Sequence, residues 1–166
     1  MTEPELGELI NFLAATPAAV RKLAESLSES ETRWKPDESE FSVVENICHL
    51  RDIELEGYTA RIHRMLSEDQ PILADIDGTR LAHERRYNEQ ELNVALDAFT
   101  QAREWNVRTI RNLSSEQLER TGMFEQTGSI TLEKLLQLMR EHDEAHLQEL
   151  NTLRGKLAAH YSTLTG

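Results

Sequence analysis

The chain has little cysteine, few basic residues and no long apolar run. Its 166 residues include a single cysteine, Cys48, so no internal disulfide can form, which fits a reducing compartment. No stretch of 18 or more apolar residues occurs, and the amino terminus lacks the basic flank and apolar segment of a signal peptide. We therefore expect a cytoplasmic protein that neither spans nor binds a membrane.

The shortage of basic side chains bears on the choice of partner. Lysine and arginine together number 18, against 30 aspartate and glutamate residues, which gives a formal net charge of −12 at pH 7. A field of this sign repels phosphate backbones and anionic lipid surfaces. The composition therefore argues against nucleic acid as a partner.

No segment shows the alternation of β-branched and polar residues that a sheet would need, and no internal repeat or low-complexity tract is present. Apolar residues instead recur at steps of three and four, which predicts four long helices over about 5–28, 42–65, 88–110 and 131–157. A composition of 39% apolar and 29% charged residues is typical of a globular domain. The sequence thus predicts an all-α four-helix bundle forming one domain, residues 1–166.

The predicted helices are joined by long connections. These span residues 29–41, 67–87 and 113–130, more than antiparallel neighbours require. Connections of this length allow crossovers or segments that cover a site. We expect a short helical turn after Ser114, and a kink or restart of the first helix at Pro17.

Two histidines one helical turn apart interrupt the apolar stripe of the fourth helix. Buried imidazoles need hydrogen-bond partners or a metal ion, and two of them this close repel each other when both are protonated. The residues alone leave two interpretations open, a metal site and a pair of core histidines with ordinary partners. The stripe consists of Leu132, Leu135, Met139, His142, His146, Leu150 and Leu153.

A mononuclear site needs at least one further protein ligand. His49, about two turns after a capping box formed by Ser42 and Glu45, could face the pair if the two helices are antiparallel. The spacing permits this position without requiring it, because the apolar stripe of the second helix is rotated away from His49. The remaining histidines are expected at the surface: His63, His83 and His160.

Other metal-binding motifs are incomplete. A zincin helix needs glutamate directly after its first histidine, where this chain has Asp143. A ferritin-like di-metal site needs two Glu-x-x-His motifs, and the sequence contains none. Residues 75–78 resemble the middle of a calcium loop, but Leu73 occupies its first ligand position, so a turn is the simpler interpretation.

The chain resembles the DinB/YfiT-like superfamily over nearly its whole length. The resemblance rests on residues 34–36 (WKP), 41–54 (FSVVENICHLRDIE) and 128–132 (GSITL), followed by 142–146 (HDEAH). It implies a four-helix bundle with unusual connections, often dimeric, and a divalent metal ion held by three histidines. Transferred to this sequence, the implied ligands are His49, His142 and His146. Many relatives have tryptophan where this chain has Phe41, a difference that affects packing rather than ligation.

The resemblance implies the chemistry only in outline, because the family includes S-transferases that use low-molecular-weight thiols, a mycothiol-dependent isomerase branch and many members without a known reaction. A metal ion on three histidines would lower the pKa of a bound water or thiol, creating a nucleophile at neutral pH. We therefore expect a homodimeric, metal-dependent thiol S-transferase or hydrolase acting on a small-molecule electrophile. The alternative is a non-catalytic metal-binding or dimerising stress or damage-response protein.

Three neutral imidazoles suit several divalent metals. Nickel and zinc are the first expectation, with iron, manganese and copper as alternatives, and a low-molecular-weight thiol would be a second cofactor of a transferase. Asp52 or Glu45 could accept the Nδ1 proton of His49. Arg103 is expected to be solvated on the third helix. Three further residues are expected to be buried packing residues: Cys48, Tyr58 and Trp105.

Overall fold

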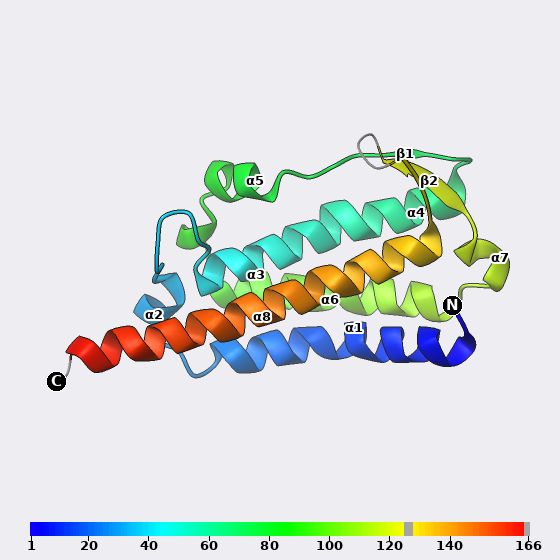
Figure 1. Cartoon of the computed structure of the whole chain (residues 1–166). Helices are drawn as coiled ribbons and strands as arrows, with labels where there is room; N and C mark the ends of the chain where they lie inside the picture. Colours follow the sequence, from blue (N-terminus) through cyan, green and yellow to red (C-terminus); the bar gives the residue numbers. More distant parts are fainter. Residues whose placement is uncertain (125–127, 165–166) are drawn as a thin grey trace.

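The computed structural model describes residues 1–124 and 128–164. Four long helical rods form a bundle, which confirms the predicted fold class (Figure 1). Packing joins α1 to α6 and α8, and α3 to the same two helices. The rods are α1 (Glu3–Ala24), α3 (Val43–Asp52) continuing through the π-helical segment η1 (Ile53–Thr59) into α4 (Ala60–Ser67), α6 (Leu92–Arg111) and α8 (Leu132–Leu164).

Polar caps set the starts of the rods. The Ser42 hydroxyl accepts the backbone N–H of Glu45 and the Glu45 carboxylate accepts that of Ser42, which confirms the predicted capping box of α3. The third helix was predicted to start at about residue 88, but α6 begins at Leu92, after Glu91. Asn88 instead lies in the 3-10 turn η2 (Tyr87–Glu89), where its side-chain oxygen accepts a hydrogen bond from Ser42 and its amide donates to the carbonyl of Arg33.

Pro17 neither breaks nor restarts the first helix, because α1 runs from Glu3 to Ala24 as one element. Proline has no N–H, so the carbonyl of Leu13 loses its usual partner four residues later. The guanidinium of Arg103 on α6 donates to that carbonyl at 3.0 Å. A side chain from another helix thus satisfies the backbone group that Pro17 leaves free.

Apolar side chains form two core clusters, one toward each end of the bundle. On α8, Met139 belongs to the first cluster and Leu150 to the second, and the polar residues of the site lie between them. On α6, Phe99 belongs to the second cluster and Val107 to the first. A polar layer therefore crosses the middle of the bundle.

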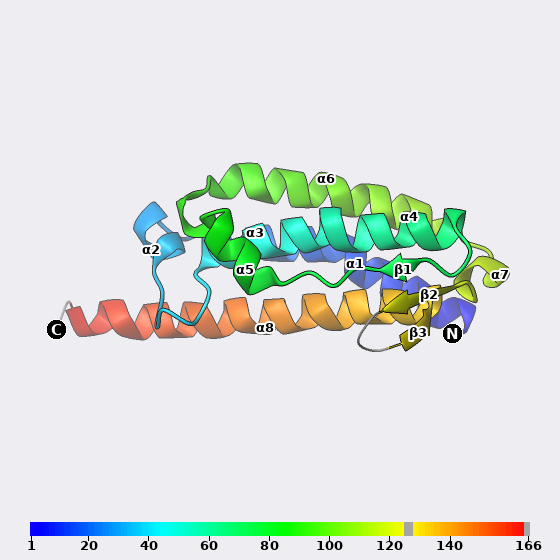
Figure 2. The same cartoon turned by 90° about the horizontal axis from the view of Figure 1, so that it is seen from above.

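The connections contain more regular structure than the sequence suggested. The expectation that no sheet forms is wrong, because a small three-stranded sheet is present in the connections. β1 pairs in parallel with β2, and β2 pairs antiparallel with β3 (Figure 2). These strands have two to four residues, too short for a detectable alternation. Ser114 caps the short helix predicted after it. The additional elements are α2 (Glu29–Arg33), β1 (Ile72–Leu73), α5 (Gly78–Glu84), α7 (Ser115–Leu118), β2 (Thr121–Phe124) and β3 (Gly128–Thr131).

Within residues 1–124 and 128–164, no helix combines the length and the apolar character needed to cross a membrane.

Candidate metal centre

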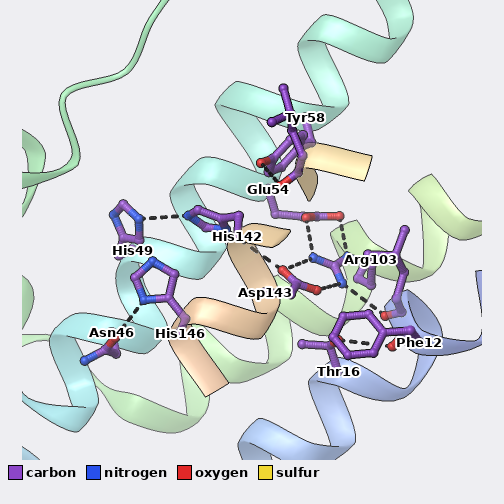
Figure 3. Close-up of polar contacts among 12 residues, drawn as sticks. Phe12, Thr16, Asn46, His49, Glu54, Tyr58, Arg103, His142, Asp143 and His146 are labelled. Carbon is purple, nitrogen blue, oxygen red and sulfur yellow. Dashed lines mark hydrogen bonds and ion pairs between the residues drawn. The ribbon is translucent and has the colours of Figure 1, made fainter. Parts of the chain in front are cut away.

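The three histidines expected as ligands come together in the polar layer. His49 projects from α3 toward His142 and His146 on α8 (Figure 3). The Nε2 atoms of His49 and His142 are 3.1 Å apart, and one ring nitrogen from each of the three residues lies within 4.8 Å of the others. The structure therefore brings together ring nitrogens from two helices, although His49 and His142 are 93 residues apart in the sequence.

The spacing of these nitrogens suits a shared metal ion. Two histidine nitrogens that each lie about 2.0–2.1 Å from zinc, at an angle of roughly 90–110°, are separated by about 2.9–3.4 Å. The 3.1 Å between the Nε2 atoms of His49 and His142 falls within this interval. The buried Nδ1 atoms of the same two residues have no hydrogen-bond partner among the described residues. The donor set and its spacing fit a divalent cation that prefers imidazole.

Hydrogen bonds determine which nitrogen of His146 faces the cluster. The amide of Asn46 donates to the carbonyl of Ser42 at 3.1 Å, which leaves its side-chain oxygen as an acceptor. That oxygen lies 2.9 Å from Nδ1 of His146, and a carboxylate oxygen of Glu149 lies 3.1 Å from the same nitrogen. Two acceptors on Nδ1 place the proton there, so Nε2 keeps the lone pair that a metal ion needs.

The electrostatics of His49 favour the neutral form of the ring. Burial, together with the neighbouring His146 and His142, lowers the pKa of His49 to about 3. The imidazole is therefore unprotonated throughout the physiological range, as ligation requires.

A buried ion network adjoins the histidines. The guanidinium of Arg103 forms two hydrogen bonds of 2.8 Å with Glu54 and two, of 2.5 and 3.0 Å, with Asp143. Asn106 adds a bond of 2.7 Å to Glu54. Burial by itself would raise the pKa of Asp143, but the charge of Arg103, together with the neighbouring His142 and the hydrogen bonds from Arg103, outweighs burial and lowers that pKa. Asp143 therefore remains ionised beside His142, whose Nδ1 is 4.0 Å from a carboxylate oxygen.

The solvated position expected for Arg103 is wrong, since the residue is only 1% exposed. A signal for its burial was present in the sequence. Arg103 lies four residues after Phe99 and four before Val107, both of them core residues of α6. Polar residues on an apolar stripe drew attention to His142 and His146, and the same criterion would have identified Arg103.

The π-helical segment η1 carries Glu54 to this network. Its wider turn inserts a residue into the rod that also contains His49, and such segments are frequent at functional sites. The Thr59 hydroxyl donates to the backbone carbonyl of Glu54 at 2.8 Å and accepts from the amide of Asn106 at 2.9 Å. A polar side chain of α6 thus anchors the distorted turn.

Neither carboxylate suggested as a partner of His49 bonds to it. Asp52 is buried and accepts hydrogen bonds from Arg51, Arg85 and Tyr87. Glu45 accepts the backbone N–H of Ser42 in the cap of α3 and pairs with Lys35. The partner that the sequence did not reveal is Asn46, which bonds to His146 instead.

The remaining predictions of burial and exposure are confirmed only in part. Cys48 and Tyr58 are buried, as predicted. Trp105 is 46% exposed, so its predicted core position is wrong, because it lies two residues from the buried Arg103 and points to another side of α6. His63 and His83 are exposed as expected, whereas His160 is partly buried and stacks on Trp34.

A cavity of about 690 Å³ opens onto His49 and His146. Gly78, at the start of α5, packs against the ring of His49 so closely that an added Cβ would lie 2.3 Å from Cε1. The charged residues of the lining, Glu40 and Glu149, are both acidic. The complete lining is Ser39, Glu40, Phe41, Asn46, His49, Gly78, Thr79, Ala145, His146, Gln148, Glu149, Thr152 and Leu153.

The chain is similar to three proteins described as metal-dependent hydrolases. A protein of Halalkalibacterium halodurans named "Putative metal-dependent hydrolase" is 26% identical over 148 residues, which cover 89% of this chain and 85% of that protein. An Oceanobacillus iheyensis protein of the same name is 22% identical over 148 residues, which again cover 89% of this chain and 85% of that protein. YfiT from Bacillus subtilis, described as "a probable metal-dependent hydrolase with an unusual four-helix bundle topology", has the same fold, with a TM-score of 0.88 and 19% identity over 95% of this chain and 90% of its own.

A family model described as the DinB superfamily matches residues 13–150. This range contains the second and third rods whole, parts of α1 and α8, and all three clustered histidines. The match extends over most of the chain. The chain belongs to the DinB superfamily.

Proposed function

We propose that this protein is a metal-dependent hydrolase in which His49, His142 and His146 hold the metal ion. The observation that carries the proposal is the convergence of three imidazole nitrogens within 4.8 Å, two of the rings also lining an open cavity. A divalent metal bound there would supply a Lewis acid and lower the pKa of a coordinated water. The names of the relatives as metal-dependent hydrolases support the same activity.

The composition of the cluster favours a catalytic role over a purely structural one. A structural zinc site is closed by four protein ligands, whereas a catalytic site has three and leaves a position for water or substrate. In the part of the chain that the structure describes, the cluster consists of three histidines without a fourth ligand. Because the cavity reaches His49 and His146, a substrate could approach from that side.

The residues of the cavity favour hydrolysis over transfer to an anionic thiol. Neither lysine nor arginine is among the described residues that line it, and Glu149 adds a negative charge next to His146. Lys156, which is not part of the lining, pairs with Glu40 at 2.6 Å. A thiol that carries carboxylates would meet repulsion here, since like charges in a cleft disfavour binding. We therefore propose an uncharged or cationic substrate with an ester or amide bond.

Elemental analysis of tag-free protein tests the metal site. We expect about one zinc or nickel ion per chain in the wild type and loss of the metal in His49→Ala, His142→Ala and His146→Ala. His63→Ala and His83→Ala are matched controls, because both side chains are exposed and away from the cluster, and should retain the metal. A wild type that remains metal-free after reconstitution would refute the proposal.

Activity assays test the reaction and the charge preference. The loaded enzyme should hydrolyse a neutral or quaternary-ammonium aryl ester faster than the matching carboxylate ester, and the three alanine variants should not. A Glu149→Gln variant should reduce the preference for the cationic ester. Turnover that depends on an added low-molecular-weight thiol, without hydrolysis in its absence, would instead establish S-transfer.

A further inference from the structure

The buried ion network beside the histidines has a geometry that serves the site. We infer that Arg103, Glu54 and Asp143 form a positioning unit for the metal centre, in which Arg103 holds the carboxylate of Asp143 beside His142 and the unit contributes negative charge that attracts a divalent cation. This inference rests on the three-histidine site proposed above. Figure 3 shows the unit next to His142, with Asp143 lying between that ring and Arg103.

The first argument is the immobilisation of Asp143. Both of its oxygens accept hydrogen bonds from Arg103, at 2.5 and 3.0 Å, so the carboxylate cannot rotate away from its neighbours. Its Oδ1 lies 4.0 Å from Nδ1 of His142, a nitrogen without a hydrogen-bond partner in the described part of the chain. A carboxylate beside the outer nitrogen of a histidine favours a proton on that nitrogen and a lone pair on the other. The inward Nε2 is the atom that faces His49.

The second argument is the charge of the unit. Arg103, Glu54 and Asp143 are each 1% exposed, and one guanidinium faces two carboxylates. With both carboxylates ionised, the formal sum is one negative charge. The other described side chain that bonds to the carboxylates is the neutral amide of Asn106. An uncompensated buried charge is costly unless a counter-charge lies nearby. A divalent cation among the histidines would provide that counter-charge.

The third argument concerns the tie between helices that the network also provides. Arg103 on α6 reaches α1 through the carbonyl of Leu13, η1 through Glu54 and α8 through Asp143. A neutral pair of Arg103 with one carboxylate would join two of these elements without excess charge, and apolar residues often stabilise a core as well as a buried ion pair does. The second carboxylate adds a tie to a further element, but cohesion alone does not require this tie to carry a charge, whereas attraction of a cation does.

The decisive experiment compares two charge-removing substitutions at adjacent positions of α8. Asp143→Asn removes the buried carboxylate beside His142. Glu144→Gln removes an exposed one that pairs with Arg140, and serves as the matched control. Affinities for zinc and cobalt are measured by competition with a chromophoric chelator, and the visible spectrum of the cobalt protein reports the ligand geometry. We expect Asp143→Asn to lower the affinity about 10- to 100-fold and shift the cobalt bands, and Glu144→Gln to leave the bands unchanged and the affinity within about twofold.

A second variant keeps the test valid if Asp143→Asn folds poorly. Glu54→Gln retains a side chain that can hydrogen-bond to Arg103, leaves Asp143 in place and removes the excess charge. It should weaken cobalt binding severalfold while the cobalt bands stay where they are, a combination that general loss of structure would not produce. Wild-type affinity and bands in every variant that folds would overturn the inference and leave the three-histidine site intact. A wild type that binds neither metal would refute the proposed function itself.

Discussion

The side-chain oxygen of Asn46 accepts a hydrogen bond from Nδ1 of His146 across 2.9 Å, although the two residues are 100 positions apart in the sequence. Asn46 can play no other part in this contact, because its amide group already donates to the carbonyl of Ser42 in the first turn of α3. The capping segment of one helix therefore determines the tautomer of a histidine on another.

Substitution of Asn46 should lower the free energy of metal binding more than it lowers the free energy of unfolding. In Asn46→Ala, His146 loses the neutral acceptor that orients its ring, so we expect the zinc affinity to fall about 10-fold. Asn151→Ala is the matched control, since the Asn151 amide donates to a backbone carbonyl on the exposed side of α8 and should leave the affinity unchanged. Competition titration measures both. Equal affinities in the two variants would contradict a role for Asn46 in orienting His146.

Substitution of Gly78 should lower the metal affinity at least as much as loss of a side chain that hydrogen-bonds to one of the histidines. An alanine Cβ at this position would lie 2.3 Å from Cε1 and 2.5 Å from Nδ1 of His49, so either the ring or α5 must move. We expect Gly78→Ala to lower the zinc affinity by about 10-fold or more.

Gly155→Ala is the control for this substitution, because a Cβ at Gly155 in α8 has no neighbour within 4 Å. That change should leave metal binding intact and raise the free energy of unfolding by about 0.5–1 kcal/mol, since alanine favours a helix interior. Zinc titration and urea unfolding of both variants provide the comparison. Unaltered zinc binding in Gly78→Ala would mean that α5 yields and His49 stays in position.

The sequence predicted the bundle and the histidine cluster for two different reasons. The rods were recognisable because long apolar stripes at helical spacing are strong signals, as on α8 from Leu132 to Leu153. His142 and His146 stood out on that stripe. The inclusion of His49 depended on the family resemblance, because α3 is buried on most of its sides and offers no single stripe against which to judge a polar residue.

Three parts of the structure could not be predicted, because no local pattern in the sequence indicates them: the role of Asn46, the strand β1 and the ion network of Arg103. Asn46 lies in a segment where residues 42–48 are all buried, so its position did not distinguish it from its neighbours. The strand β1 has two residues and pairs with Met123 and Phe124, about 50 positions later, a contact that no local pattern encodes. The position of Arg103 on the apolar stripe of α6 did signal burial, but its partners Glu54 and Asp143 come from two other helices, so no local pattern indicated the ion network that makes its burial possible.

Cys48 should be inert in the folded protein. Burial raises the pKa of its thiol from 9.0 to about 11, and the sulfur faces the carbonyl of Tyr87 and the side-chain oxygen of Gln90. A rise of two pKa units lowers the thiolate fraction at pH 8 about 100-fold. Iodoacetamide should therefore alkylate the native protein at least about 100-fold more slowly than the urea-unfolded chain. A similar rate in both states, followed by mass spectrometry, would contradict this burial.

The stability of the metal-free protein should depend on pH through His49. Its pKa is about 3 in the folded state, because of burial and the adjacent imidazoles, against an ordinary value of 6.5. As the pH falls below 6.5, the unfolded chain binds a proton that the folded protein refuses, so the free energy of unfolding declines. The slope contributed by one such group approaches about 1.4 kcal/mol per pH unit.

Urea unfolding of chelator-treated protein between pH 7 and 5 measures this slope, in a range where most carboxylates remain ionised. His49→Gln removes the titrating group and should give a shallower dependence than the wild type. His63→Gln, at an exposed position on α4, should reproduce the wild-type slope. If His49→Gln and the wild type lose stability in parallel as the pH falls, His49 takes up its proton as readily in the folded state as in the unfolded chain. The ring would then not be held neutral by its surroundings, and metal binding would have to displace a proton from it near pH 6.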